Sequence, residues 1–452
     1  MNPPVLAIDP VQVDMYAEAV PFGLLQIGTF LRNQGHEVLL VDMMASSDDH
    51  PGGVLGGESF YGVKPAGASG AMMERVVYLY GRDLDWLMSR LPDSWAPDEI
   101  WMTCCISFNY EPAFSAIDLL RRLYPRARIL LGGNYPSLFP EHAARSGANV
   151  VHRGPFRQAD GYFPELDLLE HVPPIWLFRL VRGCRYRCSF CANSARTPEL
   201  AGDPVQVAEE ILQVHRRWGV KTFSNWDPNV LLIPKAVEEM LRILIEAKTE
   251  VEIKFEMGLQ PNRLTPDILE LMNQAGVTMM TIPFESVEAH MLRRFGKPFE
   301  LHHPMDIVAS ARINGFDTHR LFHCTWVIGI RDESFRHVFG TYFAILKAGG
   351  LPTPFPLSPT PGTREYTRHR ASLAGKDLSE LNGHLWPCQP SAEMVVLYDT
   401  ILDMVSKPDP HDALELADRL SPRASRYFNR AFEWYLEGPY EPGRDPQPPP
   451  ED

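Results

Sequence analysis

The sequence contains no stretch approaching the roughly 20 consecutive apolar residues that a membrane-spanning helix needs. Its start, MNPPVLAID, has neither the basic residues nor the apolar run of a secretory signal. Only seven cysteines occur in 452 residues, and three of them are clustered. These shortages argue against a membrane protein and a disulfide-stapled secreted protein, so we predict a cytoplasmic location with reduced thiols.

The chain also lacks an excess of basic residues, since 43 Lys and Arg stand against 57 Asp and Glu, a net charge of -14. Binding to a nucleic-acid backbone needs the opposite sign, whereas an acidic chain tolerates or attracts a cationic small molecule. With 45% hydrophobic residues, the chain is long enough to form two or three domains. We therefore predict a small-molecule substrate and no nucleic-acid or membrane partner.

Three cysteines carry the strongest chemical signal. Cys184, Cys188 and Cys191 are spaced C-x3-C-x2-C. A closed structural zinc or iron–sulfur site takes four protein ligands, so three thiolates would leave one iron of a cubane cluster without a protein ligand. The alternatives are a zinc site that borrows a distant fourth ligand such as His215, or three buried thiols.

The spacing and its flanking residues resemble the radical S-adenosylmethionine (SAM) superfamily. The resemblance implies a [4Fe–4S] cluster on Cys184, Cys188 and Cys191, whose open iron chelates SAM. It further implies reductive cleavage of SAM to a 5′-deoxyadenosyl radical, with Phe190 packed near the adenine. Because only one cluster motif is present, an external flavodoxin- or ferredoxin-type reductant is implied as well.

The first 150 residues alternate apolar runs with amphipathic segments, which predicts a doubly wound parallel sheet. The expected strands are 5–8, 36–42, 99–103 and 128–131, and the expected helices are 22–34 and 112–123. Residues 45–71 are rich in Gly and Ser and predict a functional loop or an insertion. Gly132 and Gly133 follow the last strand, where they would let a ligand approach the sheet edge or would form a tight turn.

Two segments of this region, Pro21–Gly28 and Gly132–His142, resemble the N-terminal cobalamin-binding domain of one radical SAM branch. The resemblance implies cobalamin (B12) beside Gly132 and Gly133. No D-x-H-x-x-G sequence supplies a lower cobalt ligand, and residues 151–160 lack the Gly-Glu-x-Glu segment of that branch. A cobalamin site and an inherited scaffold without cobalamin both stay open.

Regular strand and helix units follow a linker. The expected strands are 176–181, 222–226, 251–255, 277–282, 321–328 and 353–357, and the expected helices are 204–218, with Asp203 as N-cap, 234–247 and 266–274. Six units resemble the partial (β/α)6 barrel of the superfamily. Catalytic groups gather at the ends of barrel strands.

The resemblance implies SAM contacts at five such positions: Asn225, Asp227, Glu285, Ser286 and Gly329. For Asp227, a turn that caps the next helix is the alternative. Pro283 stands where the superfamily usually has glycine.

The predicted organisation is a Rossmann-like B12-binding-type domain at 1–160, a linker at 161–174, a radical SAM barrel at 175–370, a helical C-terminal cap at 371–438 and a disordered tail at 439–452. No residue is assigned as catalytic. Cys324, inside the fifth strand, and Cys388, in the helical cap, are candidate hydrogen donors to a substrate radical, with buried structural thiols as the alternative.

Three functions remain open. The first is hydrogen abstraction from a small biosynthetic intermediate, followed by cobalamin-dependent C-methylation. The second is radical dehydration or epimerisation of an amino sugar without cobalamin, as in aminoglycoside-type antibiotic biosynthesis. The third is a non-catalytic iron–sulfur electron carrier.

Overall fold

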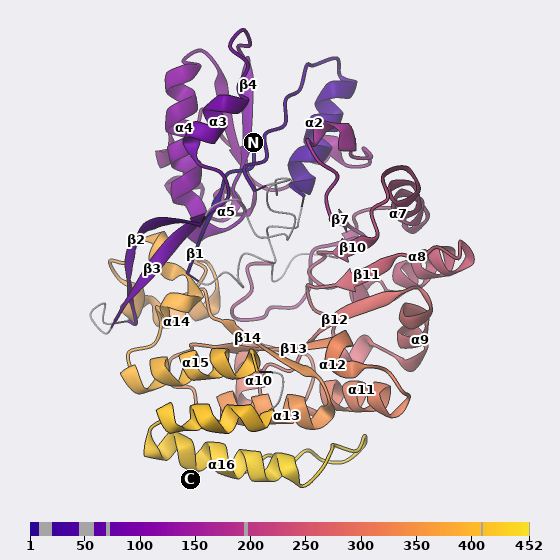
Figure 1. Cartoon of the computed structure of the whole chain (residues 1–452), viewed down its shortest axis with the longest axis vertical. Coiled ribbons are helices and arrows are strands. Elements are labelled where there is room, and N and C mark those ends of the chain that lie inside the picture. Colours follow the sequence, from indigo (N-terminus) through magenta and orange to yellow (C-terminus); the bar gives the residue numbers. More distant parts are fainter. Residues whose placement is uncertain (9–19, 45–57, 69–72, 194–197, 408–409, 452) are drawn as a thin grey trace.

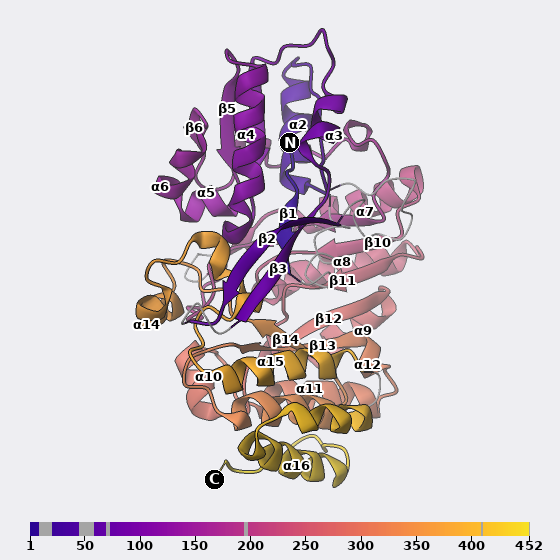
Figure 2. The ribbon, with the colours of Figure 1, turned by 60° about the vertical axis from the view of Figure 1, so that its left-hand side comes forward.

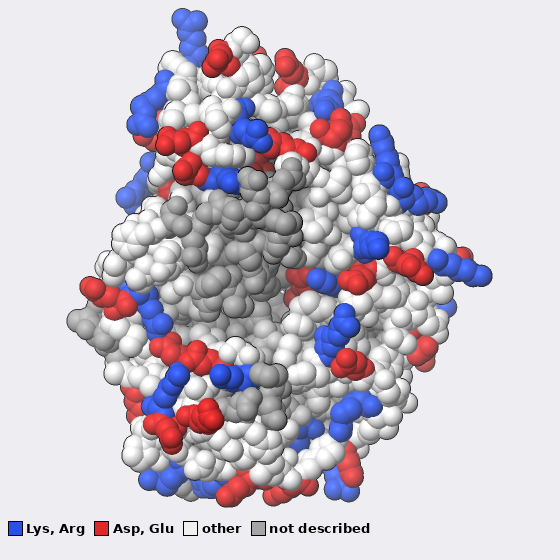
Figure 3. Space-filling model, viewed as in Figure 1, with Lys and Arg blue, Asp and Glu red and all other residues white. Residues whose placement is uncertain are grey.

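The computed structural model describes residues 1–8, 20–44, 58–68, 73–193, 198–407 and 410–451. Within these residues, no helix is both long and apolar enough to cross a membrane. The molecule is an α/β protein with the N-terminal part at one end and the last helices at the other (Figure 1 and Figure 2). Acidic and basic side chains are interspersed over the face in Figure 3, so the net negative charge does not form one patch there.

A six-stranded parallel sheet forms the centre, in the order β14-β13-β12-β11-β10-β7. Its strands are β7 (Ile175–Phe178), β10 (Thr222–Asn225), β11 (Glu252–Phe255), β12 (Val277–Pro283), β13 (Phe322–Ile328) and β14 (Leu351–Pro356). Because sequential parallel neighbours require crossovers, all six strands end at one edge. The six predicted strands are confirmed, although the first is divided into β7 and the short β8 (Val181–Arg182).

Helices connect these strands and cover the outer face of the sheet (Figure 1). They are α7 (Pro204–Trp218), α8 (Pro234–Glu246), α9 (Pro266–Gln274), α10 (Ala289–Phe295), α11 (His302–Ile313), α12 (Thr318–Leu321) and α13 (Thr341–Ala348). The predicted N-cap is confirmed, because the Asp203 carboxylate accepts hydrogen bonds from the amides of Val205 and Gln206. One apolar core joins the inner faces of these helices to the sheet.

A second parallel sheet lies in the N-terminal part, in the order β4-β5-β6. Its strands are β4 (Glu99–Thr103), β5 (Arg128–Gly132) and β6 (Val150–Val151). The helices of this part are α2 (Phe22–Asn33), α3 (Leu84–Arg90), α4 (Tyr110–Leu123), α5 (Asn134–Leu138) and α6 (Pro140–Ala143). The predicted strands 99–103 and 128–131 and both predicted helices are confirmed.

The predicted strand 5–8 is confirmed as a strand, but its place in the parallel sheet is wrong, and the predicted strand 36–42 is wrong. Strand β1 (Val5–Ala7) pairs antiparallel with β3 (Met73–Tyr80), which pairs with β2 (Glu58–Ala66). The segment 36–42 forms only an isolated bridge between Asn2 and Asp42. The Gly- and Ser-rich interval therefore contains strand β2 within its described residues 58–68. The hairpin of β2 and β3 pairs with β1, which a doubly wound sheet would have placed among its parallel strands. The rest of the predicted loop, residues 45–57 and 69–71, lies outside the described residues.

The C-terminal part consists of α14 (Arg364–Leu373), α15 (Ala392–Val405), the 3-10 helix Pro410–Arg419 and α16 (Pro422–Leu436). Residues 440–451, for which we predicted disorder, pack against this part instead. The Tyr427 hydroxyl donates to the carbonyl of Pro449, and the Arg336 amide donates to the Glu451 carboxylate. These hydrogen-bond partners belong to other elements of the chain, and the composition of the tail does not predict such contacts.

Candidate functional site

The cysteine loop is residues 183–193, and it follows the short strand β8, which lies outside the central sheet. Strand β8 pairs with β9 (Glu199–Leu200), so the segments that precede and follow the cysteine loop are hydrogen-bonded to each other. The Ser189 amide donates to the carbonyl of Phe295, the last residue of α10, at 2.9 Å. The loop thus lies at the carboxyl edge of the sheet, where ligands of parallel sheets bind.

A buried carboxylate holds the middle of the loop. Glu365, in the first turn of α14, has a side chain with 0% exposure. It accepts hydrogen bonds from the Ser189 hydroxyl at 2.9 Å, from Arg294 at 2.9 Å and from Arg368 at 2.8 Å. Burial opposes its charge, but hydrogen bonds from His369 and Arg294 outweigh this and lower the pKa of Glu365 to about 2. The carboxylate is therefore ionised and fixes the segment between two of the cysteines.

The three cysteines of the motif carry free thiols on this loop. Cys184, Cys188 and Cys191 are free and half-buried, and burial raises the pKa of Cys188 and Cys191. In the described part of the chain, no three His, Cys, Asp or Glu side chains are arranged to hold one metal ion. A cubane cluster takes its thiolates on separate irons and needs no such single-ion cage. His215, the possible fourth zinc ligand, has its Nδ1 2.8 Å from the carbonyl of Val220.

Glu285 and Lys297 form an ion pair beside the loop. Lys297 Nζ lies 2.7 Å from Glu285 Oε1 and 5.0 Å from the centroid of the Phe190 ring. Glu285 Oε2 is buried without a hydrogen-bond partner among the described residues, and Glu285 has a left-handed backbone, with φ of 61°. An unpartnered buried carboxylate oxygen is costly, as is this backbone geometry in a residue other than glycine. This oxygen is thus an unused acceptor of the kind that a cationic ligand such as the SAM ammonium group would fit.

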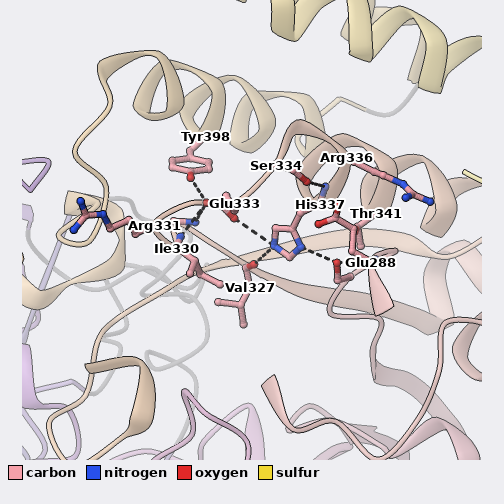
Figure 4. Close-up of polar contacts among 12 residues, drawn as sticks. Glu288, Val327, Ile330, Arg331, Glu333, Ser334, Arg336, His337, Thr341 and Tyr398 are labelled. Atoms are coloured by element: carbon pink, nitrogen blue, oxygen red, sulfur yellow. Dashed lines mark hydrogen bonds and ion pairs between the residues drawn. The ribbon is translucent and has the colours of Figure 1, made fainter. Parts of the chain in front are cut away.

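Ser286 belongs to a buried network with His337 and Glu333, and Figure 4 shows the last two. His337 Nε2 donates to the carbonyl of Val327 at 2.8 Å, and Nδ1 lies 2.9 Å from Ser286 Oγ. Burial lowers the pKa of His337 to about 4, so the ring is neutral near pH 7 and Nδ1 accepts the Ser286 proton. Ser286 therefore offers a ligand only acceptor capacity.

Gly329 is held by the same network. Glu333 Oε1 accepts hydrogen bonds from the amides of Gly329 and Ile330, at 2.8 and 2.9 Å, and from the Tyr398 hydroxyl of α15 (Figure 4). Burial raises the pKa of Glu333 well above its usual value. Gly329 has a φ of 87°, and a Cβ there would lie 2.9 Å from the Trp386 ring. Only glycine fits this strand end without displacing the indole.

Asn225 and Asp227 are bonded to the chain itself. Asp227 Oδ2 accepts hydrogen bonds from the amides of Leu180 and Val181, at 2.8 and 2.7 Å, and from Asn225 Nδ2 at 2.8 Å. Both residues are buried. Their side chains therefore join the end of β10 to the segment that enters the cysteine loop.

The glycine pair predicted for cobalamin lies at the carboxyl edge of the N-terminal sheet. Gly132 ends β5, and Gly133, with a φ of 107°, precedes α5. A Cβ at Gly133 would lie 2.4 Å from the carbonyl oxygen of Cys104, which follows the neighbouring strand β4. The need for glycine at this position is thus explained by packing between two strand ends.

The two candidate hydrogen donors are fully buried thiols. Cys324 lies within β13, and Cys388 follows α14 in a turn rather than in a helix. Burial raises the pKa of Cys324 well above its usual value and that of Cys388 to about 12. Cys388 packs in a small apolar cluster that Phe190 borders, while Cys324 packs in the main core. Both are placed as structural thiols are.

Residues 178–341 match the sequence profile described as the Radical SAM superfamily. This range, little more than a third of the chain, is similar to the radical SAM superfamily. The matched range contains the three cysteines and the ends of β10 to β13, and it stops before Glu365.

The chain is 26% identical to the bacteriochlorophyllide d C-12(1)-methyltransferase of Chlorobaculum tepidum, over 51% of this chain and 58% of that protein. It thus spans little more than half the length of this curated relative. Two solved structures share the fold. One is TsrM of Kitasatospora setae with cobalamin and a [4Fe–4S] cluster, at 14% identity and a TM-score of 0.53, covering 79% of this chain and 73% of that one. The other is OxsB with aqua-cobalamin and SAM, at 11% identity and a TM-score of 0.59, covering 94% of this chain and 70% of that one.

Sequence reasoning missed the groups that shape the site from a distance. Glu365 and Arg294 hold the cysteine loop, and His337 and Tyr398 support the ends of β12 and β13. One signal was present in the sequence: Glu333 lies four residues after Gly329, for which a SAM contact was predicted, and His337 follows Glu333 by four residues.

Proposed function

We propose that this protein is a radical SAM enzyme that acts on a carbon of a small biosynthetic intermediate, with cobalamin-dependent C-methylation as the outcome. The observation that supports it best is the pairing of two features at one sheet edge. Three half-buried thiols lie on a loop fixed by Glu365, and an unpartnered buried oxygen of Glu285 lies beside that loop.

Cys184, Cys188 and Cys191 would hold the cluster. When bound and reduced, the cluster would supply the electron for cleavage of SAM, and this chemistry would lead to removal of a hydrogen atom from the substrate. The chain's own contribution is to orient and shield. Glu365 fixes the loop, and the Phe190 ring offers an apolar face near the last cysteine for the adenine.

The remaining SAM contacts are assigned from the hydrogen-bonding capacity that each group does not use within the chain. Glu285 Oε2 would accept a hydrogen bond from the SAM ammonium group, Ser286 Oγ would act as an acceptor, and the backbone at Gly329 would flank the adenine. Asn225 and Asp227 would act indirectly, by positioning the entrance to the cysteine loop. A neutral His337 and a buried Glu333 would keep two strand ends rigid.

We place cobalamin, which would supply the methyl group, in a B12-binding-type domain at 1–160, beside Gly132 and Gly133. The cobalamin-bound structures of similar fold support this assignment, and the name of the curated relative supports methylation. Radical dehydration or epimerisation is the second candidate, because residues 151–160 lack the Gly-Glu-x-Glu segment. We further propose an external flavodoxin- or ferredoxin-type reductant and, because all seven cysteines are free, a cytoplasmic location.

The test is anaerobic reconstitution of the purified protein with iron, sulfide and hydroxocobalamin, followed by desalting and measurement of bound iron, bound cobalt and 5′-deoxyadenosine formation. We expect about four irons and one cobalt per chain. Iron without cobalt would move dehydration or epimerisation to first place. The matched control is the variant Cys184→Ala/Cys188→Ala/Cys191→Ala, which should lose both the cluster and deoxyadenosine formation. Deoxyadenosine formed by this variant would refute radical SAM chemistry at this loop.

A further inference from the structure

The charge around the cysteine loop is opposite to that of the whole chain. Three segments, 179–191, 289–297 and 363–370, contain one acidic residue, Glu365, whereas acidic residues outnumber basic ones in the chain by 57 to 43. The basic residues of these segments are Arg179, Arg182, Arg185, Arg187, Arg293, Arg294, Lys297, Arg364, Arg368 and Arg370. The motif that holds the cysteines thus lies among the most cationic stretches of an acidic protein.

These three segments touch one another. The Ser189 amide bonds to the carbonyl of Phe295 at 2.9 Å, and Arg364 Nη2 donates to the carbonyl of Arg187 at 2.5 Å. The acid among them is buried and is already shared by Arg294 and Arg368. Arg182 pairs with Asp160, and Lys297 pairs with Glu285, both outside these segments. The positive charge that remains is carried by exposed arginines.

We define the arginine patch as the exposed side chains that surround the loop: Arg185, Arg187, Arg293, Arg364 and Arg368. The first three make no ion pair with any described residue. The exposed acid nearest in sequence to these segments is Glu300, three residues after Lys297, and its carboxylate lies 3.6 Å from the ring of His302. Helices α10 and α14, which carry the last three arginines, lie on the same side of the molecule in Figure 2.

We propose that the arginine patch is the docking surface for an acidic one-electron carrier protein, an inference that rests on the proposed function. Complementary charge steers such encounters and fixes their orientation. Arg185 and Arg187 both lie between Cys184 and Cys188, so a docked carrier lies against the loop that would hold the cluster. One electron leaves the reduced carrier, which is oxidised, and reduces the cluster. Exposed arginines spread over three elements fit the surface of a protein better than a small anion.

The experiment follows reduction of the cluster in the reconstituted protein by stopped-flow absorbance. The donors are reduced flavodoxin, an acidic carrier, and reduced methyl viologen, a small cation. In the variant Arg293→Glu/Arg364→Gln, we expect the bimolecular rate with flavodoxin at low salt to fall about tenfold. The difference should shrink at about 0.5 M salt, where screening shortens the range of these charges. Gln keeps a donor near the carbonyl of Arg187.

The matched control is Arg216→Glu/Arg242→Gln, which makes the same charge change at exposed positions of α7 and α8. It should leave the flavodoxin rate within about twofold of the wild-type rate. With viologen, a cation that the added negative charge attracts, the patch variant should be no slower than the wild type. Equal slowing with both donors, or equal slowing in the control, would overturn the docking assignment.

Calorimetric titration of flavodoxin into the wild type and the patch variant separates this inference from the function. Weaker binding in the variant supports docking even if SAM is not cleaved. Equal binding refutes docking even if deoxyadenosine forms. A patch that instead binds an anionic substrate would give this second result.

Discussion

Single buried carboxylates decide how much of the site exists before any cofactor binds. Glu365 is fully buried and links Ser189 of the cysteine loop to Arg294 of α10. Removing one partner of a buried ion pair leaves the other charge uncompensated, which typically costs about 3 kcal/mol. The cluster loop is therefore shaped by a residue almost 180 positions further along the chain.

We expect Glu365→Ala to lower the free energy of unfolding by about 3 kcal/mol at pH 7 and to weaken iron retention. The folded-state pKa of about 2 lies below the usual 4.5, so this contribution is present above pH 4.5 and is lost as the pH falls toward 2. Urea unfolding at several pH values measures it. The control Glu441→Ala, which breaks an exposed pair with Arg444, should change stability by less than about 0.5 kcal/mol. Equal unfolding midpoints for Glu365→Ala and the wild type at pH 7 would contradict the prediction.

At the scale of the elements, the contact between α7 and β7 contains a carboxyl group whose neutral form stabilises the fold more than its charged form. Glu210 on α7 accepts a hydrogen bond from Trp176 Nε1 on β7 at 3.0 Å, and burial raises the pKa of Glu210 to about 7. The stability it contributes is full below pH 4.5 and is lost as the pH rises through 7. We expect Glu210→Gln, which keeps the acceptor, to stabilise the fold by about 2 kcal/mol at pH 8 and to change little at pH 4. Urea unfolding at both pH values tests this, with the exposed neighbour Glu209→Gln as control. A stabilisation of the same size at both pH values would contradict a titration origin.

Elements that follow local rules could be predicted from the sequence. Helix α7 has a helical period of apolar residues, an N-cap at Asp203 and an ending at Gly219, which together define its boundaries. The short buried apolar runs from β10 to β14 predict strands. The segment 36–42 carries the same signal but forms no strand, because pairing depends on a neighbour and β1 pairs with β3 instead. The three cysteines of the site were predictable from their spacing. Glu365 was not, because a charged residue in a helix usually faces solvent.

At the scale of the whole molecule, distant segments close the C-terminal end. Composition predicts a free tail after residue 438, yet Tyr440 is 5% exposed and belongs to the main core. Its hydroxyl lies 2.9 Å from the Asp306 carboxylate on α11, and its amide donates to the carbonyl of Lys347. A proline-rich segment can thus be ordered when one aromatic side chain finds a cavity in the core.

Replacing Tyr440 distinguishes a C-terminal tail that packs on the core from a tail that is disordered. Tyr440→Ala leaves a cavity in the core and should lower the free energy of unfolding by about 3 kcal/mol in urea titrations. A disordered segment would give less than about 0.5 kcal/mol, the range of surface substitutions. Leu436→Ala, at a position 53% exposed in the last turn of α16, is the matched control and should cost no more than about 1 kcal/mol. Equal small losses for both variants would mean that the tail adds nothing to the fold and that the core ends at α16.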